Sequence, residues 1–195
     1  MRPPILDLVE SRGFQVFESG DYNLNIIGIR NPEAAPNRFD DMLIVVWKEK
    51  GIWKEERFPC TTAPGQYWLQ NPGRRSGTAV LKHDQQMRSV YKLDNHGSKN
   101  PYLALCQRNG AVTVWRDPNK DLVADYGGDE DRGYFGINIH RASSRKESTH
   151  VWKWSAGCTV ISDPEDFDRF IEICKLQVFH RGWHTFTYTL LMADI

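Results

Sequence analysis

Short runs of hydrophobic residues, many of them β-branched or aromatic, recur along the chain between clusters of turn residues. Runs of this length and composition are typical of β-strands. The strands predicted in this way span residues 24–29, 43–47, 52–58, 67–70, 78–81, 87–93, 102–107, 111–115, 134–141 and 184–192. Glu49-Lys50-Gly51 predicts a hairpin before residue 52, and Asn109-Gly110 predicts another before residue 111. The pattern predicts a mainly β fold, with mixed sheets in a β-sandwich or barrel-like arrangement.

One helix is clear near the C-terminus, between Asp163 and Gly182. Asp163 suits the N-cap, Pro164 suits the first helical position, and Gly182 suits the end of the helix. Residues 3–12 predict a second, short helix near the N-terminus. The apolar face of the C-terminal helix consists of Phe167, Phe170, Ile171, Cys174 and Val178.

Length and composition narrow the classes of function. The chain has 195 residues, which suits one domain. We expect residues 1–40 to form an N-terminal extension packed on a domain of residues 41–195, in one structural unit. The 25 basic and 25 acidic residues balance without a basic block, so nothing indicates nucleic-acid binding. The absence of an apolar run of about 18 residues predicts no transmembrane segment.

The N-terminus lacks the apolar centre of a secretory signal, because Asp7 and Glu10 interrupt it. We therefore expect a chain made in the cytoplasm, whose four cysteines are reduced thiols rather than disulfides. Cys60, Cys106 and Cys174 are interpreted as core residues, since buried free cysteine packs as a small hydrophobe.

The fourth cysteine stands in a different context. His140 ends one predicted strand, and Cys158 begins another after the turn Ser155-Ala156-Gly157, although Gly and Ser weaken strands. A cysteine and a histidine in this order are the parts of a nucleophilic site, in which the imidazole and nearby backbone N–H groups favour the thiolate. The amides of Gly157 and Cys158 are candidates for an oxyanion hole, with Ser155 as a supporting hydrogen-bonding residue. No third side chain is evident to orient His140, so a backbone carbonyl is the candidate for that role.

The connection between His140 and Cys158 is expected to form one wall of a cleft. The sulfur should then lie within hydrogen-bond reach of an imidazole nitrogen, or slightly beyond it. Arg141 and the other basic residues of the connection are candidates for binding substrate carboxylates. Trp152 and Trp154 either line a substrate groove or pack beneath the loop. Ala156 lies where a substrate carbonyl would approach the turn.

Two segments resemble a known family. Ile139-His140 followed by Ser155-x-Gly157-Cys158 resembles the signature of the L,D-transpeptidase (YkuD-type) catalytic domain, in which a His precedes a Ser/Thr-His-Gly-Cys turn. Thr62-Ala63-Pro64-Gly65-Gln66-Tyr67 resembles the Thr-Pro-x-Gly-x-Phe/Tyr segment that precedes a strand in these domains. The resemblance covers roughly residues 40–190.

The resemblance implies an L,D-transpeptidase-like fold and a cysteine acyltransferase, without a cofactor, that acts on peptidoglycan stem peptides through a thioester. It also implies a site of action at the cell wall or periplasm, reached after release or secretion, as for a phage lysin or a secreted effector. The chain departs from the family pattern at Ala156, Val160 and Arg141, where the family has His, a polar residue and Gly. Two alternatives therefore stay open: a peptidoglycan L,D-carboxypeptidase or endopeptidase, and a catalytically weak wall-binding module.

Metal-dependent functions are weaker alternatives. Oxygen-bearing side chains follow the spacing of a calcium loop, but Leu122 and Gly128 stand where an EF-hand has Gly and Glu. A polar turn is the other interpretation, and the acidic run 129–131 is interpreted as a solvated loop. No His-Glu-x-x-His or similar spacing supports a zinc peptidase. The calcium candidates are Asp117, Asn119, Asp121 and Asp125, and the zinc candidates are His83, His96, His150, His180 and His184.

Overall fold

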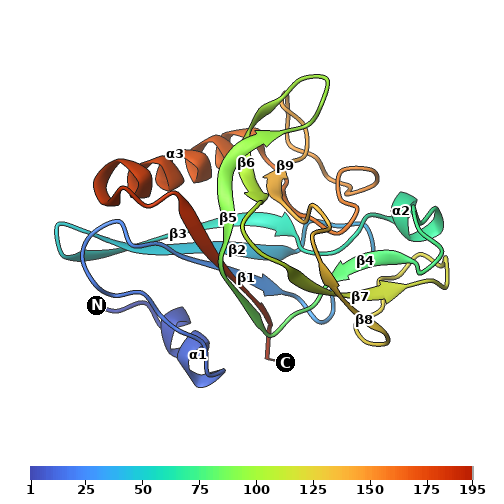
Figure 1. Ribbon diagram of the computed structural model, residues 1–195, viewed down its shortest axis with the longest axis horizontal. Coiled ribbons are helices and arrows are strands. Elements are labelled where there is room, and N and C mark those ends of the chain that lie inside the picture. The colour runs from blue at the N-terminus through green and yellow to red at the C-terminus, as the bar shows by residue number, and fades with distance from the viewer. Residues whose placement is uncertain (195) are drawn as a thin grey trace.

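The computed structural model describes residues 1–194 and shows a mainly β protein (Figure 1). The prediction of a mainly β fold, with one clear helix near the C-terminus and a short one near the N-terminus, is confirmed. The helices are α1 (Ile5–Ser11), α2 (Gln66–Gln70) and α3 (Pro164–Arg181). The strands are β1 (Asn25–Arg30), β2 (Asp41–Glu49), β3 (Ile52–Thr61), β4 (Thr78–Leu81), β5 (Gln85–His96), β6 (Tyr102–Gln107), β7 (Val112–Asp117), β8 (Glu130–Gly133), β9 (Ile139–Arg141), β10 (Thr159–Ile161) and β11 (Thr185–Met192).

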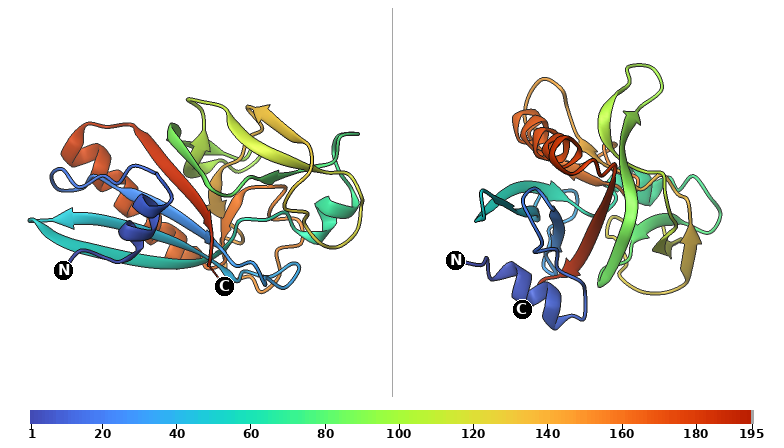
Figure 2. Two further views of the ribbon diagram at one scale, coloured as in Figure 1. Left: turned by 90° about the horizontal axis from the view of Figure 1, so that it is seen from below. Right: turned by 60° about the vertical axis from the view of Figure 1, so that its left-hand side comes forward.

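Most strands belong to a closed barrel in the order β1-β11-β5-β6-β9-β10-β3-β2. The pairs β1–β11 and β9–β10 are parallel and the other pairs are antiparallel, so the sheet is mixed, as predicted. β4, β7 and β8 form a separate three-stranded sheet, which lies beside the barrel together with α2 (Figures 1 and 2). The protein therefore has a barrel and a smaller sheet next to it.

The barrel strands near the N-terminus bury side chains on both of their faces. Ile26 and Leu190 belong to the main core, whereas their neighbours Ile27 and Leu191 pack with Leu6 of α1 on the opposite face. Strands with this pattern appear in the sequence as continuous apolar runs rather than as alternating ones. The core also takes up Cys60, Cys106 and Cys174, which are all free thiols with no exposed surface, as predicted.

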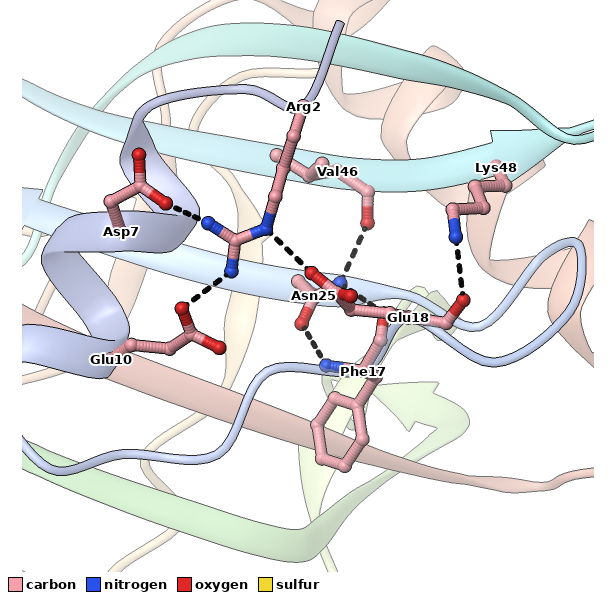
Figure 3. A network of polar contacts seen from close by, with 8 residues as sticks. All are labelled: Arg2, Asp7, Glu10, Phe17, Glu18, Asn25, Val46 and Lys48. Carbon is pink, nitrogen blue, oxygen red and sulfur yellow. Dashed lines mark hydrogen bonds and ion pairs between the residues drawn. The ribbon is translucent and has the colours of Figure 1, made fainter.

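The N-terminal segment is attached to the barrel by polar contacts as well as by packing (Figure 3). The Asn25 amide of β1 accepts from the Phe17 N–H (2.8 Å) and donates to the Phe17 carbonyl (2.9 Å), and the Lys48 ammonium of β2 donates to the Glu18 carbonyl (2.9 Å). Within the segment, the Arg2 guanidinium contacts the carboxylates of Asp7, Glu10 and Glu18. Residues 25–30 of the predicted N-terminal extension form β1, which pairs with β2 and β11. This part of the extension is therefore a strand of the barrel rather than an addition to it.

Helix α3 begins and ends where the sequence predicts. The Asp163 carboxylate accepts hydrogen bonds from the backbone N–H groups of Glu165 (2.7 Å) and Asp166 (3.4 Å), and Gly182 adopts the left-handed conformation with φ 66°. The buried face includes Phe167, Phe170 and Cys174 and packs against β3, β6, β9 and β10. Within residues 1–194, no helix combines the length and the apolar character needed to cross a membrane.

Three sequence predictions of secondary structure are wrong in whole or in part. The run 67–70, predicted as a strand, is helix α2, which buries only Leu69. In the acidic run 129–131, predicted as a solvated loop, Asp129 and Glu130 are exposed, but residues 130–131 belong to β8. This strand pairs with β7 and places the Asp131 carboxylate 2.6 Å from the Arg116 guanidinium. The predicted strand 134–141 is reduced to β9, because Gly136 has φ 72° and interrupts the extended chain. Local sequence propensity does not predict which strands or side chains these three segments contact.

The predicted hairpins have different outcomes. Glu49 pairs with Ile52 across a turn in which Lys50 and Gly51 have positive φ, so the first hairpin is confirmed. The second is wrong, because β6 pairs with β5 and β9 whereas β7 pairs with β4 and β8. The backbone N–H groups of Arg108 and Asn109 both donate to the Val90 carbonyl of β5. The turn therefore passes the chain from the barrel to the smaller sheet.

Candidate active site

The parallel pair β9–β10 brings His140 and Cys158 to the same side of the sheet. His140 pairs with Val160, and Cys158 directly precedes β10, opposite Asn138. Partners in register on parallel strands point to the same face, and so do residues two apart along one strand. His140, Asn138, Cys158 and Val160 therefore share one face, and the prediction that the two candidate residues come from adjacent strands is confirmed.

The Cys158 sulfur forms hydrogen bonds with the backbone rather than with an imidazole. It accepts a hydrogen bond from the Asn138 N–H (3.3 Å) and donates one to the Gly136 carbonyl (3.4 Å). Within residues 1–194 no hydrogen bond joins it to His140. Burial raises the pKa of the Cys158 thiol to about 11, although the Asn138 N–H acts in the opposite direction. The hydrogen bond expected between the sulfur and an imidazole nitrogen is therefore absent among the described residues, and the sulfur pairs with the backbone on both sides.

Ser155 holds the turn that carries the sulfur. Its hydroxyl donates to the Cys158 carbonyl (2.8 Å) and accepts from the Gly157 N–H (3.2 Å). The structure corrects the expectation that the Gly157 amide belongs to an oxyanion hole, since Ser155 already uses that N–H group. The Cys158 N–H, by contrast, has no hydrogen-bond partner within residues 1–194, and Cys158 itself is 9% exposed.

Only glycine fits at position 157. Gly157 has φ 123°, and a Cβ at this position would lie 2.4 Å from the Ala79 carbonyl oxygen of β4. That distance is far below van der Waals contact, so a side chain would displace the turn. The small sheet therefore packs directly behind the candidate nucleophile, which accounts for the small residues next to Cys158.

His140 is held in one tautomer by a backbone carbonyl, as expected from the sequence. Its Nδ1 lies 2.8 Å from the Arg141 carbonyl oxygen and 3.4 Å from the Tyr102 hydroxyl. A carbonyl only accepts hydrogen bonds, so Nδ1 carries the proton and Nε2 keeps a lone pair. Burial, together with neighbouring His96, lowers the pKa of His140 to about 3. The ring is therefore neutral near pH 7 and presents the tautomer that a general base needs.

A pocket of about 390 Å³ opens beside His140. The connection between the two strands forms one wall of it through Arg141, Lys153 and Trp154, as predicted, and Trp154 is 44% exposed. The Arg141 guanidinium lies 3.8 Å from the centre of the Tyr102 ring. Trp152 is also exposed but does not line this pocket. The pocket therefore combines cationic groups with aromatic surface.

The upstream segment at Thr62–Tyr67 supports the same turn. The Gly65 N–H donates to the Ser155 carbonyl (2.9 Å), and a Cβ on Gly65 would lie 2.1 Å from the Trp152 carbonyl oxygen. The Trp68 indole donates to the Lys153 carbonyl (3.0 Å). Ala156 is exposed on this side and lines a second pocket of about 270 Å³. Two segments singled out separately in the sequence are thus in contact.

The predicted calcium loop does not present a set of oxygen ligands. The Asn119 amide donates to the carboxylates of Asp121 (3.1 Å) and Asp125 (2.9 Å), and Asp117 accepts from the Asp125 N–H (3.0 Å). The amide thus turns N–H groups, not oxygen, toward these carboxylates. Among residues 1–194 no group of three or more His, Cys, Asp or Glu side chains is placed to hold a metal ion, which also applies to the zinc candidates.

Three residues of this site were not predicted as parts of it: His96, Tyr102 and Asn138. His96 and Tyr102 come from β5 and β6, and both line the pocket beside His140. The only signal in the sequence is that Asn138 and His140 are two residues apart and so share a strand face. Comparison with protein-family models, curated proteins and solved structures found no match for the chain. The resemblance to L,D-transpeptidases therefore rests on the two motifs alone.

Proposed function

We propose that the protein is a cysteine-dependent acyl-transfer enzyme, with Cys158 as nucleophile and His140 as general base. One observation carries the proposal: a cysteine and a neutral histidine share a strand face, and the histidine is fixed with Nε2 unprotonated. His140 is also one of the residues that line the pocket. The L,D-transpeptidase-like motifs extend the proposal to peptidoglycan stem peptides as the substrate.

The reaction starts from two neutral groups. A substrate carbonyl enters the pocket, and His140 Nε2 takes the thiol proton as the Cys158 sulfur attacks the carbonyl carbon. Attack and proton transfer occur together, because a resting thiol with a pKa of about 11 does not ionise first. The Cys158 N–H donates to the oxygen that becomes negative.

The acyl group then passes to an acceptor. The imidazolium of His140 protonates the leaving amine as the carbon–nitrogen bond breaks, and a thioester on Cys158 remains. In the second half, His140 takes a proton from water or an amine while its oxygen or nitrogen attacks the thioester carbon. The carbon–sulfur bond breaks, and the proton returns to the sulfur. Water as acceptor makes the enzyme a peptidase or carboxypeptidase, and an amine makes it a transpeptidase.

The lining of the pocket favours an anionic peptide. Arg141 and Lys153 both face the pocket, and stem peptides carry carboxylates that pair with such groups. Each cation also lies over an aromatic ring, Arg141 over Tyr102 and Lys153 over Tyr67 at 4.1 Å. These contacts keep the cations in place without neutralising them.

Intact-protein mass spectrometry tests the proposal. Incubation with purified muropeptides is expected to add one acyl mass to the wild-type protein and none to Cys158→Ala. Cys106→Ala is the matched control, since Cys106 is a buried cysteine outside the proposed chemistry. Product analysis with and without an added amine separates transfer from hydrolysis. Turnover by a folded Cys158→Ala variant at the wild-type rate refutes the thiol mechanism.

A further inference from the structure

A second histidine lies directly against His140. His96 ends β5, and its ring stacks on the His140 ring with centroids 4.2 Å apart and an interplanar angle of 19°. It also makes an edge contact with Tyr102, at 5.4 Å between centroids. His96 lines the same pocket as His140. Two imidazoles thus stand side by side at the mouth of the candidate site.

The tautomer of His96 follows from its partner Asn138. The Asn138 Oδ1 accepts a hydrogen bond from the Gln107 backbone N–H (2.9 Å), which can only donate. The Asn138 amide nitrogen is therefore the atom that lies 3.0 Å from His96 Nδ1, and it donates there. His96 Nδ1 accepts, so the neutral ring carries its proton on Nε2.

The two rings are therefore held in opposite tautomers. His140 has its proton on Nδ1 and an open lone pair on Nε2, whereas His96 has an N–H at Nε2. Burial and the guanidinium groups of Arg108 and Arg141 lower the pKa of His96, which keeps this ring neutral as well. At Nε2, His140 is thus fixed as an acceptor and His96 as a donor. No hydrogen-bond partner of His96 Nε2 is found within residues 1–194.

The acyl-transfer site needs such a donor. An oxyanion hole usually combines more than one donor, and here the Gly157 N–H is already taken by the Ser155 hydroxyl. The Cys158 N–H is left as a single backbone donor. His96 lines the pocket and stacks on the ring of the proposed general base, so its Nε2–H is the candidate for a second donor.

We propose that His96 is a further catalytic residue of the proposed reaction, whose Nε2–H donates a hydrogen bond to the substrate carbonyl oxygen as its negative charge develops. Asn138 is the positioning residue for this donor, because its amide selects the tautomer of His96. The same Asn138 donates its backbone N–H to the Cys158 sulfur, so one residue orients both nucleophile and donor. The inference rests on the proposed function, since the carbonyl is that of the acyl donor.

The test is the His96→Phe variant, which keeps a flat ring against His140 and removes the N–H. We expect acylation by muropeptides to slow about 100-fold, with KM changed little, because the lost bond forms mainly in the transition state. His96→Gln retains an amide donor and is expected to recover part of the rate. Iodoacetamide labelling of Cys158, a displacement without an oxyanion, should match the wild-type rate in both variants and reports that the site is folded.

A second measurement separates a donor from a purely structural residue. p-Nitrophenyl acetate and its thiono analogue differ only in the carbonyl atom, and sulfur accepts hydrogen bonds poorly. The wild-type preference for the oxygen ester should shrink in His96→Phe, which a packing defect would not cause. An unchanged preference and rate in His96→Phe overturn the role of His96 alone. A wild-type protein that forms no acyl-enzyme with any of these probes overturns the proposed function and this inference together.

Discussion

The buried neutral state of His140 makes the stability of the protein dependent on pH. The ring is 5% exposed, and burial lowers its pKa from 6.5 to about 3. The unfolded chain therefore binds a proton below pH 6.5 that the folded protein does not bind, so acid favours unfolding. Lowering the pH from 8 to 5 should reduce the free energy of unfolding by about 2 kcal/mol through His140 alone. Below pH 3 the complete pKa shift of His140 should reduce it by on the order of 5 kcal/mol.

Urea unfolding at pH 8, 7, 6 and 5 measures this effect. The half-buried His96 and His83 also have a lowered pKa and act in the same direction, so the wild-type protein is compared with His140→Gln. The variant should lose about 2 kcal/mol less than the wild type between pH 8 and pH 5. His150→Gln is the matched control, because His150 is exposed, and it should follow the wild type. Parallel pH profiles for the wild type and His140→Gln would refute the reasoning.

Two further predictions concern the turn at Cys158. Cys158 is 9% exposed whereas the other three cysteines are fully buried, so iodoacetamide should label Cys158 first. Because the pKa of this thiol is about 11, its labelling rate should rise about tenfold per pH unit up to pH 10. Residue-resolved mass spectrometry checks this, and a plateau below pH 9 would contradict it. Gly157→Ala should lower the free energy of urea unfolding by about 3 kcal/mol or more, because of the contact with Ala79 and the positive φ. Gly51→Ala, where φ is 75° and the space is open, should cost only about 1 kcal/mol, and equal losses would argue against the clash.

Elements with a local cause were predictable from the sequence. Helix α3 follows from its cap at Asp163, its apolar spacing and Gly182, which act within the helix itself. The hairpin at Lys50-Gly51 follows from the conformational preference of its own turn. The turn at Asn109-Gly110 has the same preference, but the partners that it meets are Val90 and the small sheet. A turn signal determines that the chain reverses and leaves open which strand it then joins.

Some features of the candidate site could likewise be predicted from the sequence, and others depend on the fold. Cys158, His140 and the Ser155–Gly157 turn could be recognised in the sequence, because residue types at short spacing suggest their chemistry. The sequence also led to the expectation of a thiolate–imidazolium pair, and the structure shows that His140 and Cys158 are both buried. Burial shifts both pKa values, and burial depends on how distant segments close over β9 and β10. The same holds for His96, whose role as a donor depends on Asn138 and Gln107, residues from two other strand regions.

The sequence by itself determined the β class, the C-terminal helix and the residues able to carry nucleophilic chemistry, since these follow from propensity, capping and local spacing. Only the tertiary structure decided that Gly157 lies against β4, that Gly65 supports Ser155, and that His96 stacks on His140. Each of these contacts joins segments that are distant in the chain. Their geometry depends on strand register and closure of the barrel, which no single segment specifies.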